Sequence, residues 1–220
     1  MYNTLFPDEK FRNYLLNESY GKDGELTENE INDITQIIIS DRNISSLAGI
    51  EYFTALELLW CYDNQLTALD VSKNTALKDL WCDNNQLTAL DVSNNTALTL
   101  LECYNNSIKG ADMDALVGSL PQNTTSSSQL FIIVDISKDA PEGNVCTRAQ
   151  AAVAKAKGWT VKAVDGDEEM EYEGSDIVTG ISGAVCSSAE ATPVFTLSGQ
   201  RIAAPRKGIN IAGGKKIMVK

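Results

Sequence analysis

Histidine is absent from the 220-residue sequence, and its absence narrows the chemistry that the chain can perform. It excludes Ser-His-Asp triads, histidine general bases and histidine-ligated metal sites. Long hydrophobic runs are also missing, because no apolar segment reaches the roughly 18 residues that a membrane-spanning helix requires. Positive charge is scarce, with 18 Lys and Arg against 30 Asp and Glu, for a formal net charge of −12. This balance argues against nucleic acid and anionic membranes as partners.

Both ends of the sequence differ from its centre. The N-terminus has no signal peptide, because Met1-Tyr2-Asn3-Thr4 leads directly into polar sequence. If the protein is exported, its leader has been removed from this sequence. Residues 174–220 carry six Lys or Arg residues and two carboxylates, so the acidity lies before them. We therefore expect residues 174–220 to form a separate unit.

Four positions recur every 21 residues in the first half of the sequence. They are Leu56, Leu77 and Leu98; Leu59, Leu80 and Leu101; Cys61, Cys82 and Cys103; and Asn64, Asn85 and Asn106. A fixed period in this range predicts a solenoid, in which each turn buries its apolar side against its neighbours. Residues 34–55 fit a divergent first turn with a spacing of 22 residues, as expected where a terminal turn meets a cap.

Each end of the solenoid has a predicted cap. Residues 1–33 are expected to be a helical N-terminal cap, and residues 34–110 the repeats. Residues 111–173 contain a short helix, a strand, an Ala-rich helix and a second strand, which predicts a βαβ cap that extends a parallel sheet. An acidic loop is expected at 165–169. Short β segments between Gly-containing turns predict a small antiparallel β structure in 174–220.

One segment of the N-terminal cap allows two interpretations. Thr27 and Glu30 match a helix capping box. The same segment partly fits a calcium-binding EF-hand loop, with Asp23 and Glu30 as candidate ligands, although Ser19 and Gly21 stand where stronger ligands are needed. We favour the turn and helix cap, and we expect no cofactor.

The repeat L-x-x-L-x-C/L-x-x-N-x-L is similar to the leucine-rich-repeat signature over residues 34–110. The motif Leu-Thr-Ala-Leu-Asp-Val-Ser-x-Asn-Thr-Ala-Leu resembles the repeats of secreted and surface leucine-rich-repeat proteins of Gram-negative anaerobes. Residues 44–50 resemble the 22-residue internalin style, and residues 195–217 resemble C-terminal sorting or anchoring tails. The resemblance implies an α/β fold, a right-handed solenoid with a parallel sheet. It also implies a secreted or cell-surface adhesion protein with no catalytic residues to carry over.

Alternation along each strand places the neighbours of the inward leucines on the outer, concave face of the sheet. Like positions then stack in columns: Gln36, Leu58, Asp79 and Leu100; Ile38, Trp60, Trp81 and Glu102; Ser40, Tyr62, Asp83 and Tyr104; Asp41, Asp63, Asn84 and Asn105. Aromatic surface with a polar rim is typical of binding sites. The candidate ligand-binding residues are Leu58, Trp60, Tyr62, Asp63, Asp79, Trp81, Asp83, Glu102 and Tyr104.

The expected function is non-catalytic recognition of a protein, peptide or glycan, by a monomer or weak homodimer. Four strands span roughly 15–20 Å, which suits a short peptide, a glycan or weak multivalent contact. Aromatic stacking alone, or cover by the tail, would explain the same residues in a structural scaffold of the cell envelope. A carbohydrate-processing enzyme is a remote alternative, since Asp79 and Asp83, or Asp83 and Glu102, could form a carboxylate pair. An open, wet face gives no reason for either pKa to rise.

Two of the repeated columns predict structural roles. Asn64, Asn85 and Asn106 are expected to form an interior ladder that satisfies backbone groups after each strand. Cys61, Cys82 and Cys103 are expected to be small buried hydrophobic residues, because a straight column lacks the fourth ligand of a tetrahedral zinc site. Cys146 and Cys186 could pair if the tail folds back on the cap.

Overall fold

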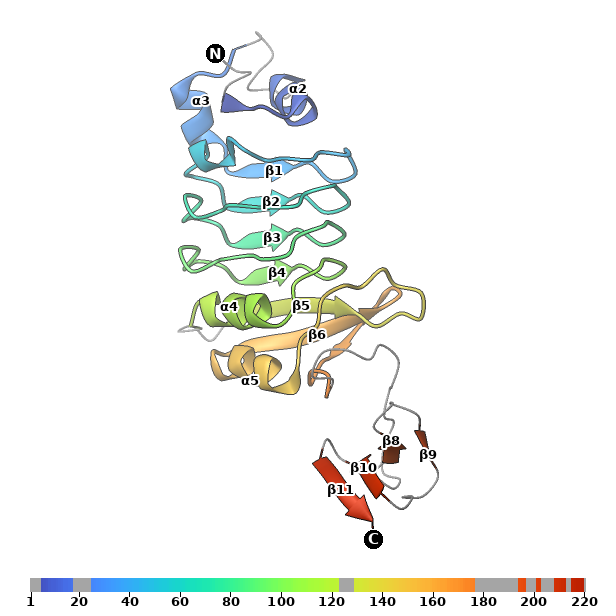
Figure 1. The fold of residues 1–220 in the computed structure, drawn as a ribbon. Coiled ribbons are helices and arrows are strands. Elements are labelled where there is room, and N and C mark those ends of the chain that lie inside the picture. The colour runs from blue at the N-terminus through green and yellow to red at the C-terminus, as the bar shows by residue number, and fades with distance from the viewer. Residues whose placement is uncertain are drawn as a thin grey trace. The chain divides into compact units, whose positions relative to one another are not determined.

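The computed structural model describes residues 5–17, 25–122 and 129–176, together with the backbone of four strands between 194 and 219. The chain divides into two compact units, residues 1–180 and residues 181–220. In the first unit the strands stack one beside the next, with α2 and α3 near β1 and with α4 and α5 beside β5 and β6 (Figure 1). This architecture is a leucine-rich-repeat solenoid of the α/β class.

A seven-stranded open sheet forms the spine of the first unit, and its strands follow the order of the sequence. They are β1 (Gln36–Ile38), β2 (Leu58–Trp60), β3 (Asp79–Trp81), β4 (Leu100–Glu102), β5 (Gln129–Asp135), β6 (Trp159–Asp165) and β7 (Glu168–Glu171). Neighbours pair in parallel from β1 to β6, and β7 pairs antiparallel with β6. At about 4.8 Å per strand the sheet spans roughly 30 Å, longer than four repeat strands alone would give.

The core lies on one side of this sheet. Leu59, Leu80 and Leu101 pair in register and are fully buried, while the strand residues on either side of each are half-buried. The same row continues into the cap through Phe131 and Val161, which are also fully buried. Burying a side chain of this size contributes about 1.5–3 kcal/mol, so the row stabilises the stack of turns. The predicted repeat register is confirmed.

A single inserted residue explains the 22-residue spacing of the first turn. The segment Leu47-Ala48-Gly49-Ile50 replaces the shorter Leu69-Asp70-Val71 of the next turn. Gly49 has a φ of 104°, and the 3-10 helix η1 (Ile50–Tyr52) follows it. A Cβ on Gly49 would lie 2.3 Å from Cδ1 of Phe6. Glycine is therefore required both for the left-handed backbone and for the close approach of the cap.

The N-terminal cap consists of α2 (Glu9–Asn17) and α3 (Glu28–Asp33). Asp8 caps α2, because its Oδ1 accepts from the backbone N–H of Lys10 at 2.9 Å and of Phe11 at 3.1 Å. Its Oδ2 accepts from the N–H and the hydroxyl of Ser45, both at 2.9 Å. One carboxylate thus joins the cap to the loop of the first turn. Burial raises the pKa of Asp8, but these hydrogen bonds outweigh it and hold the pKa below its usual value.

The C-terminal cap contains α4 (Ala111–Ser119) and α5 (Arg148–Ala156). Helix α5 connects β5 to β6, which run parallel, so the predicted βαβ unit is confirmed. The expected acidic loop at 165–169 is partly wrong, because Glu168 begins strand β7. Gly166 and Asp167 make the tight hairpin turn that leads into it, and the φ of Gly166 is 62°.

The asparagine ladder is confirmed and is longer than the repeat predicts. Asn85 donates to the carbonyl groups of Cys61, Cys82 and Asp83 at 3.0–3.2 Å and accepts from the N–H of Leu66 at 2.9 Å. The ladder continues at Asn144 of the cap. A second, unpredicted ladder occupies two of the turns: Asn74 and Asn95 are fully buried and donate to carbonyl groups of the preceding turn.

The cysteine column also occupies the core. Cys61, Cys82 and Cys103 are free, fully buried thiols, and burial raises the pKa of each. They therefore stay protonated and pack as small hydrophobic residues, as predicted. Cys146 is likewise a free, buried thiol, whereas Cys186 lies outside the described residues.

The second unit contains an antiparallel sheet in the order β11-β10-β8-β9. Its strands are β8 (Val194–Thr196), β9 (Arg201–Ile202), β10 (Gly208–Ala212) and β11 (Lys215–Val219). The antiparallel β structure predicted for the C-terminal segment is confirmed at the level of the backbone. Among the described residues, no helix is long and apolar enough to cross a membrane.

Candidate binding face

The face of β1–β4 that points away from the core is called the concave face below. Parallel register places Leu58 beside Asp79 and Asp79 beside Leu100. It also places Trp60 beside Trp81, and Trp81 beside Glu102. The first two predicted outward columns are therefore confirmed as neighbours on one face. Whether a ligand binds there is a separate question.

The aromatic residues of the concave face touch one another. The rings of Trp60 and Trp81 stack, with centroids 4.5 Å apart and planes 19° from parallel. Tyr62 lies against Trp81, with centroids 5.9 Å apart. Ile38 comes before Trp60 in the same column and is 42% exposed. Together these four residues form an apolar stripe across three strands, called the aromatic stripe below.

Asp79 links the aromatic stripe to the charged part of the face. The indole Nε1 of Trp60 lies 3.4 Å from Oδ1 of Asp79 and donates to it. Burial raises the pKa of Asp79 above its usual value, and the Trp60 indole, which donates to this carboxylate, offsets part of the rise. The buried Nε1 of Trp81 has no hydrogen-bond partner among the described residues. The half-buried Leu58 and Leu100 flank Asp79 in its column, which explains the loss of water around the carboxylate.

Asp83 is the most buried carboxylate of the face, at 3% exposure. The 21-residue spacing aligns this small residue with the larger Tyr62 and Tyr104 of the adjacent turns. Its Oδ2 accepts from Nδ2 of Asn84 at 2.9 Å, whereas its buried Oδ1 has no hydrogen-bond partner among the described residues. Burial raises the pKa of Asp83 to about 6, although Tyr104 and Asn84 oppose the rise.

Glu102 is half-buried beside Trp81, and burial together with repulsion from Asp83, Glu169 and Asp79 raises its pKa to about 7. The expectation that nothing raises a carboxyl pKa on this face is therefore wrong. The rise has a physical cause in crowding: Asp79, Asp83 and Glu102 share a partly apolar surface, and no cation of the described residues pairs with them. Tyr104 shares that environment, and burial beside Asp83 raises the pKa of its hydroxyl as well.

The backbone conformation of Asp63 explains why an Asp stands at this position, which its place in the outward column does not. Its φ is 52°, and the equivalent residues Asp41, Asn84 and Asn105 have φ values of 52°, 50° and 49°. Every turn needs a left-handed residue after its strand, and Asp and Asn adopt this conformation more readily than other non-glycine residues. The column therefore reflects the bend of the chain. Asp63 is exposed at the rim of the aromatic stripe, where burial and Asp41 raise its pKa.

Glu142 of the cap is a further buried carboxylate that the sequence did not single out. It accepts from the backbone N–H groups of Asn105 at 2.9 Å, Asp135 at 2.7 Å and Asn144 at 2.6 Å. Burial nevertheless raises its pKa to about 7. It joins the last turn to the cap, so its role is to stabilise the contact between these two parts of the fold.

Of the two candidate calcium ligands, the structure describes Glu30. Asp23 lies outside the described residues. Glu30 closes the predicted capping box, because its Oε2 accepts from the N–H of Thr27 at 2.8 Å and from the Thr27 hydroxyl at 2.7 Å. Within the described ranges, no three His, Cys, Asp or Glu side chains converge as metal ligands.

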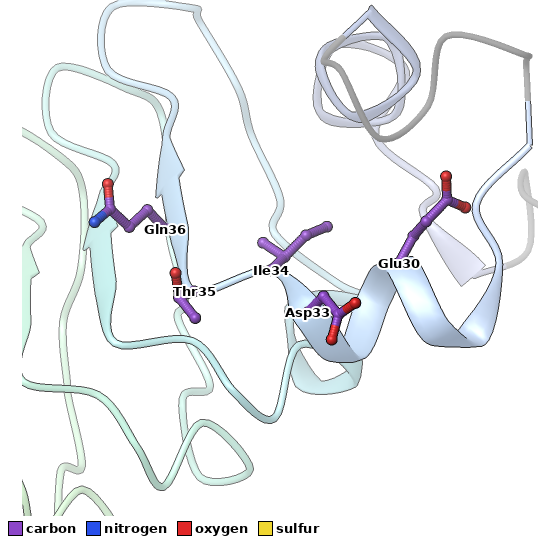
Figure 2. A pocket seen from close by; sticks show the side chains of 5 residues that line it. All are labelled: Glu30, Asp33, Ile34, Thr35 and Gln36. Atoms are coloured by element: carbon purple, nitrogen blue, oxygen red, sulfur yellow. The ribbon is translucent and has the colours of Figure 1, made fainter.

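A hollow of about 340 Å³ lies at the junction of α3 and β1. Figure 2 shows its five lining residues on this junction: Glu30, Asp33, Ile34, Thr35 and Gln36. None of them is a candidate residue of the aromatic stripe or a member of the Asp79, Asp83 and Glu102 group. The hollow therefore does not enclose a carboxylate pair of the concave face.

Comparison with known proteins gives limited matches. A family model described as "LVIVD repeat" matches residues 82–106. No curated protein matches the sequence significantly. Among solved structures, the functional domain of InlJ from Listeria monocytogenes, which includes a cysteine ladder, is 28% identical with a TM-score of 0.45, over 66% of this chain and 31% of that one.

Two internalins of Listeria monocytogenes are also similar. Internalin InlF is 25% identical with a TM-score of 0.44, over 63% of this chain and 41% of that one. Internalin C2 is 16% identical with a TM-score of 0.31, over 74% of this chain and 96% of that one. The chain thus spans less than half the length of the InlJ domain and of InlF. Its structural neighbours are internalin leucine-rich-repeat proteins.

Proposed function

We propose that this chain is a non-catalytic recognition or adhesion module that binds a protein, peptide or glycan through the concave face. The observation that carries the proposal is the aromatic stripe. Trp60 and Trp81 are only half-buried and stand on the side of the sheet that faces away from the core. Stacking of the turns requires Leu59 and Leu80 on the other side, but it does not require tryptophan here.

Half-buried aromatic residues with a polar rim support binding, because Trp and Tyr supply much of the binding energy in interfaces. Asp63, Asp79 and Glu102 provide that rim. The resemblance of the repeat and of residues 195–217 to secreted and surface proteins supports a location at the bacterial cell surface or outside the cell. Recognition outside the cytoplasm is consistent with both features.

A structural scaffold of the cell envelope is the second candidate. The stacked geometry of Trp60 and Trp81 favours it to some degree, since an aromatic pair contributes about 0.5–1.5 kcal/mol beyond its buried area. In a scaffold the pair would stabilise the repeats without contacting a ligand. The two functions therefore differ in whether loss of the pair affects binding or only stability.

The test is a binding screen against host matrix proteins, short peptides and glycans with the full chain. Each binder is measured again with Trp60→Ala/Trp81→Ala and with the control Tyr52→Ala, which removes an exposed aromatic residue at η1, away from the concave face. We expect the double variant to lose at least about 2 kcal/mol of binding energy while circular dichroism shows it folded. Binding that survives the double variant would place the site elsewhere.

A further inference from the structure

Glu102 lacks a partner. Among the described residues its carboxylate forms no ion pair and no hydrogen bond, although it is half-buried. In its column it lies between Trp81 and Ile132, and Ile132 is 1% exposed. Lys162 is the next residue of the column, but it is paired with Glu169 at 2.9 Å. The cation nearest in register is therefore engaged elsewhere.

Asp83 adds an independent observation beside Glu102. Its Oδ1 is a buried acceptor without a donor in the described structure, on the same side of the sheet as Trp81. A buried acceptor without a donor costs free energy, and more so when it carries charge. Asp83 follows β3 and Glu102 lies in β4, and the two carboxylates repel each other. The buried Nε1 of Trp81 lacks an acceptor as well, so the uncompensated negative charge, and not a shortage of donors, favours a ligand with positive charge.

The aromatic stripe fits the same kind of ligand. Trp60 covers one face of the Trp81 ring, and Glu102 is the neighbour of Trp81 on its other side. A cation placed over a tryptophan face is attracted by the ring's quadrupole, and a carboxylate beside it adds an ion pair. The chain itself shows the first of these contacts at another place, where the Arg42 guanidinium lies 5.0 Å above the Tyr14 ring.

We propose that Trp81, Glu102 and Tyr104 hold a lysine or arginine side chain of an extended basic peptide segment from a protein partner. The inference rests on the concave-face function proposed above and specifies its ligand. A peptide fits better than a free amine, because Leu100 lies in the same strand as Glu102, and Leu58 and Ile38 lie on the strands beyond Trp81, where a chain that crosses the sheet can pack against them. Charge complementarity with an acidic face supports the choice.

The test uses three capped nine-residue probes that alternate glycine with lysine, glutamine or glutamate, measured by calorimetry with the full chain at low and physiological salt. We expect only the lysine peptide to bind, more weakly as salt rises. Glu102→Gln should weaken it by about fivefold or more. This variant removes a repelled carboxylate and is expected to fold at least as stably as the wild type.

Asp112→Asn is the matched control, because it removes the same charge from an exposed position in the first turn of α4. It should leave binding unchanged. Equal binding of the glutamine peptide, or of wild type and Glu102→Gln, would overturn the proposal, as would N-acetyl-lysine methyl ester binding as tightly as the peptide. A neutral glycan that binds and is lost in Trp60→Ala/Trp81→Ala would also overturn it while supporting the broader function. No binding of any screened ligand to this face would contradict both.

Discussion

Asn144 Oδ1 accepts from the backbone N–H of Ile108 at 2.8 Å, across 36 residues of sequence. Its Nδ2 donates to the carbonyl groups of Cys103 at 2.8 Å and Ile133 at 2.9 Å. Asn85 and Asn106 bond to the backbone in the same way inside the repeats. The cap therefore continues the internal hydrogen bonding of the solenoid although its sequence no longer repeats.

Substitution of a ladder asparagine should destabilise the protein without changing ligand affinity in the folded fraction. We expect Asn85→Ala and Asn144→Ala each to lower the free energy of unfolding by about 2–3 kcal/mol, because each leaves buried backbone groups unpaired. Asn94→Ala is the control, since Asn94 is exposed beside the buried Asn95. Urea unfolding measures the three effects. Equal stability of Asn85→Ala and Asn94→Ala would contradict the ladder argument.

Leu80 tests the register of the core row. It is fully buried between Leu59 and Leu101, so Leu80→Ala should leave a cavity and cost about 2–5 kcal/mol. Leu80→Met keeps most of the volume and should cost less than about 1.5 kcal/mol. Urea unfolding of both variants measures the difference. A loss below about 0.5 kcal/mol for alanine is incompatible with this position in the core.

The elements that repeat could be predicted from the sequence, because a period fixes both the strand register and the inward face. Leu59, Cys61 and Asn64 are buried where the 21-residue spacing places them. The ladder residue Asn144 could not be predicted, since it follows no period. Asn74 and Asn95 do follow the period, and a systematic search for buried polar columns would have found them.

The electrostatics of the candidate site were less predictable. Asp83 and Glu102 lose water to side chains that come together only after folding. A sequence pattern predicts the column in which each carboxylate lies, but it does not predict how far folding removes water from that carboxylate. For Asp63 the sequence pattern predicts a binding residue, whereas its left-handed backbone conformation is enough to explain why Asp stands at this position.

Gly49 tests how the cap meets the first turn. Gly49→Ala should destabilise the protein by more than about 1 kcal/mol, because of its φ of 104° and the 2.3 Å approach of Phe6 to an added Cβ. Gly118→Ala is the matched control, since Gly118 lies in α4 with no atom within 4 Å of an added Cβ. There alanine should stabilise the helix by about 0.5–1 kcal/mol. Thermal unfolding of both variants separates the two effects, and a neutral Gly49→Ala would mean that Phe6 does not pack there.

The raised pKa values predict that stability falls as the solution becomes less acidic. In the folded protein the pKa is about 6 for Asp83 and about 7 for Glu102 and Glu142, above the usual range of unfolded carboxyl groups near 4. Between about pH 4 and pH 7 the folded state therefore binds more protons than the unfolded state, and the free energy of unfolding decreases as pH rises. Asp63 and Asp79 act in the same direction, whereas Asp8, with its lowered pKa, favours folding only above its own acidic range.

Urea unfolding at pH 5 and pH 8 measures this effect. A tenfold change in the proton affinity of one carboxyl group on folding corresponds to about 1.4 kcal/mol, and partial exposure of Glu102 reduces its share. We therefore expect the free energy of unfolding to fall by at least about 2 kcal/mol between pH 5 and pH 8. Glu102→Gln should make the profile flatter, because it removes one proton that the folded state retains. Higher stability at pH 8 than at pH 5 would show that cations already neutralise the concave face, and the same result would remove the electrostatic support for a basic ligand.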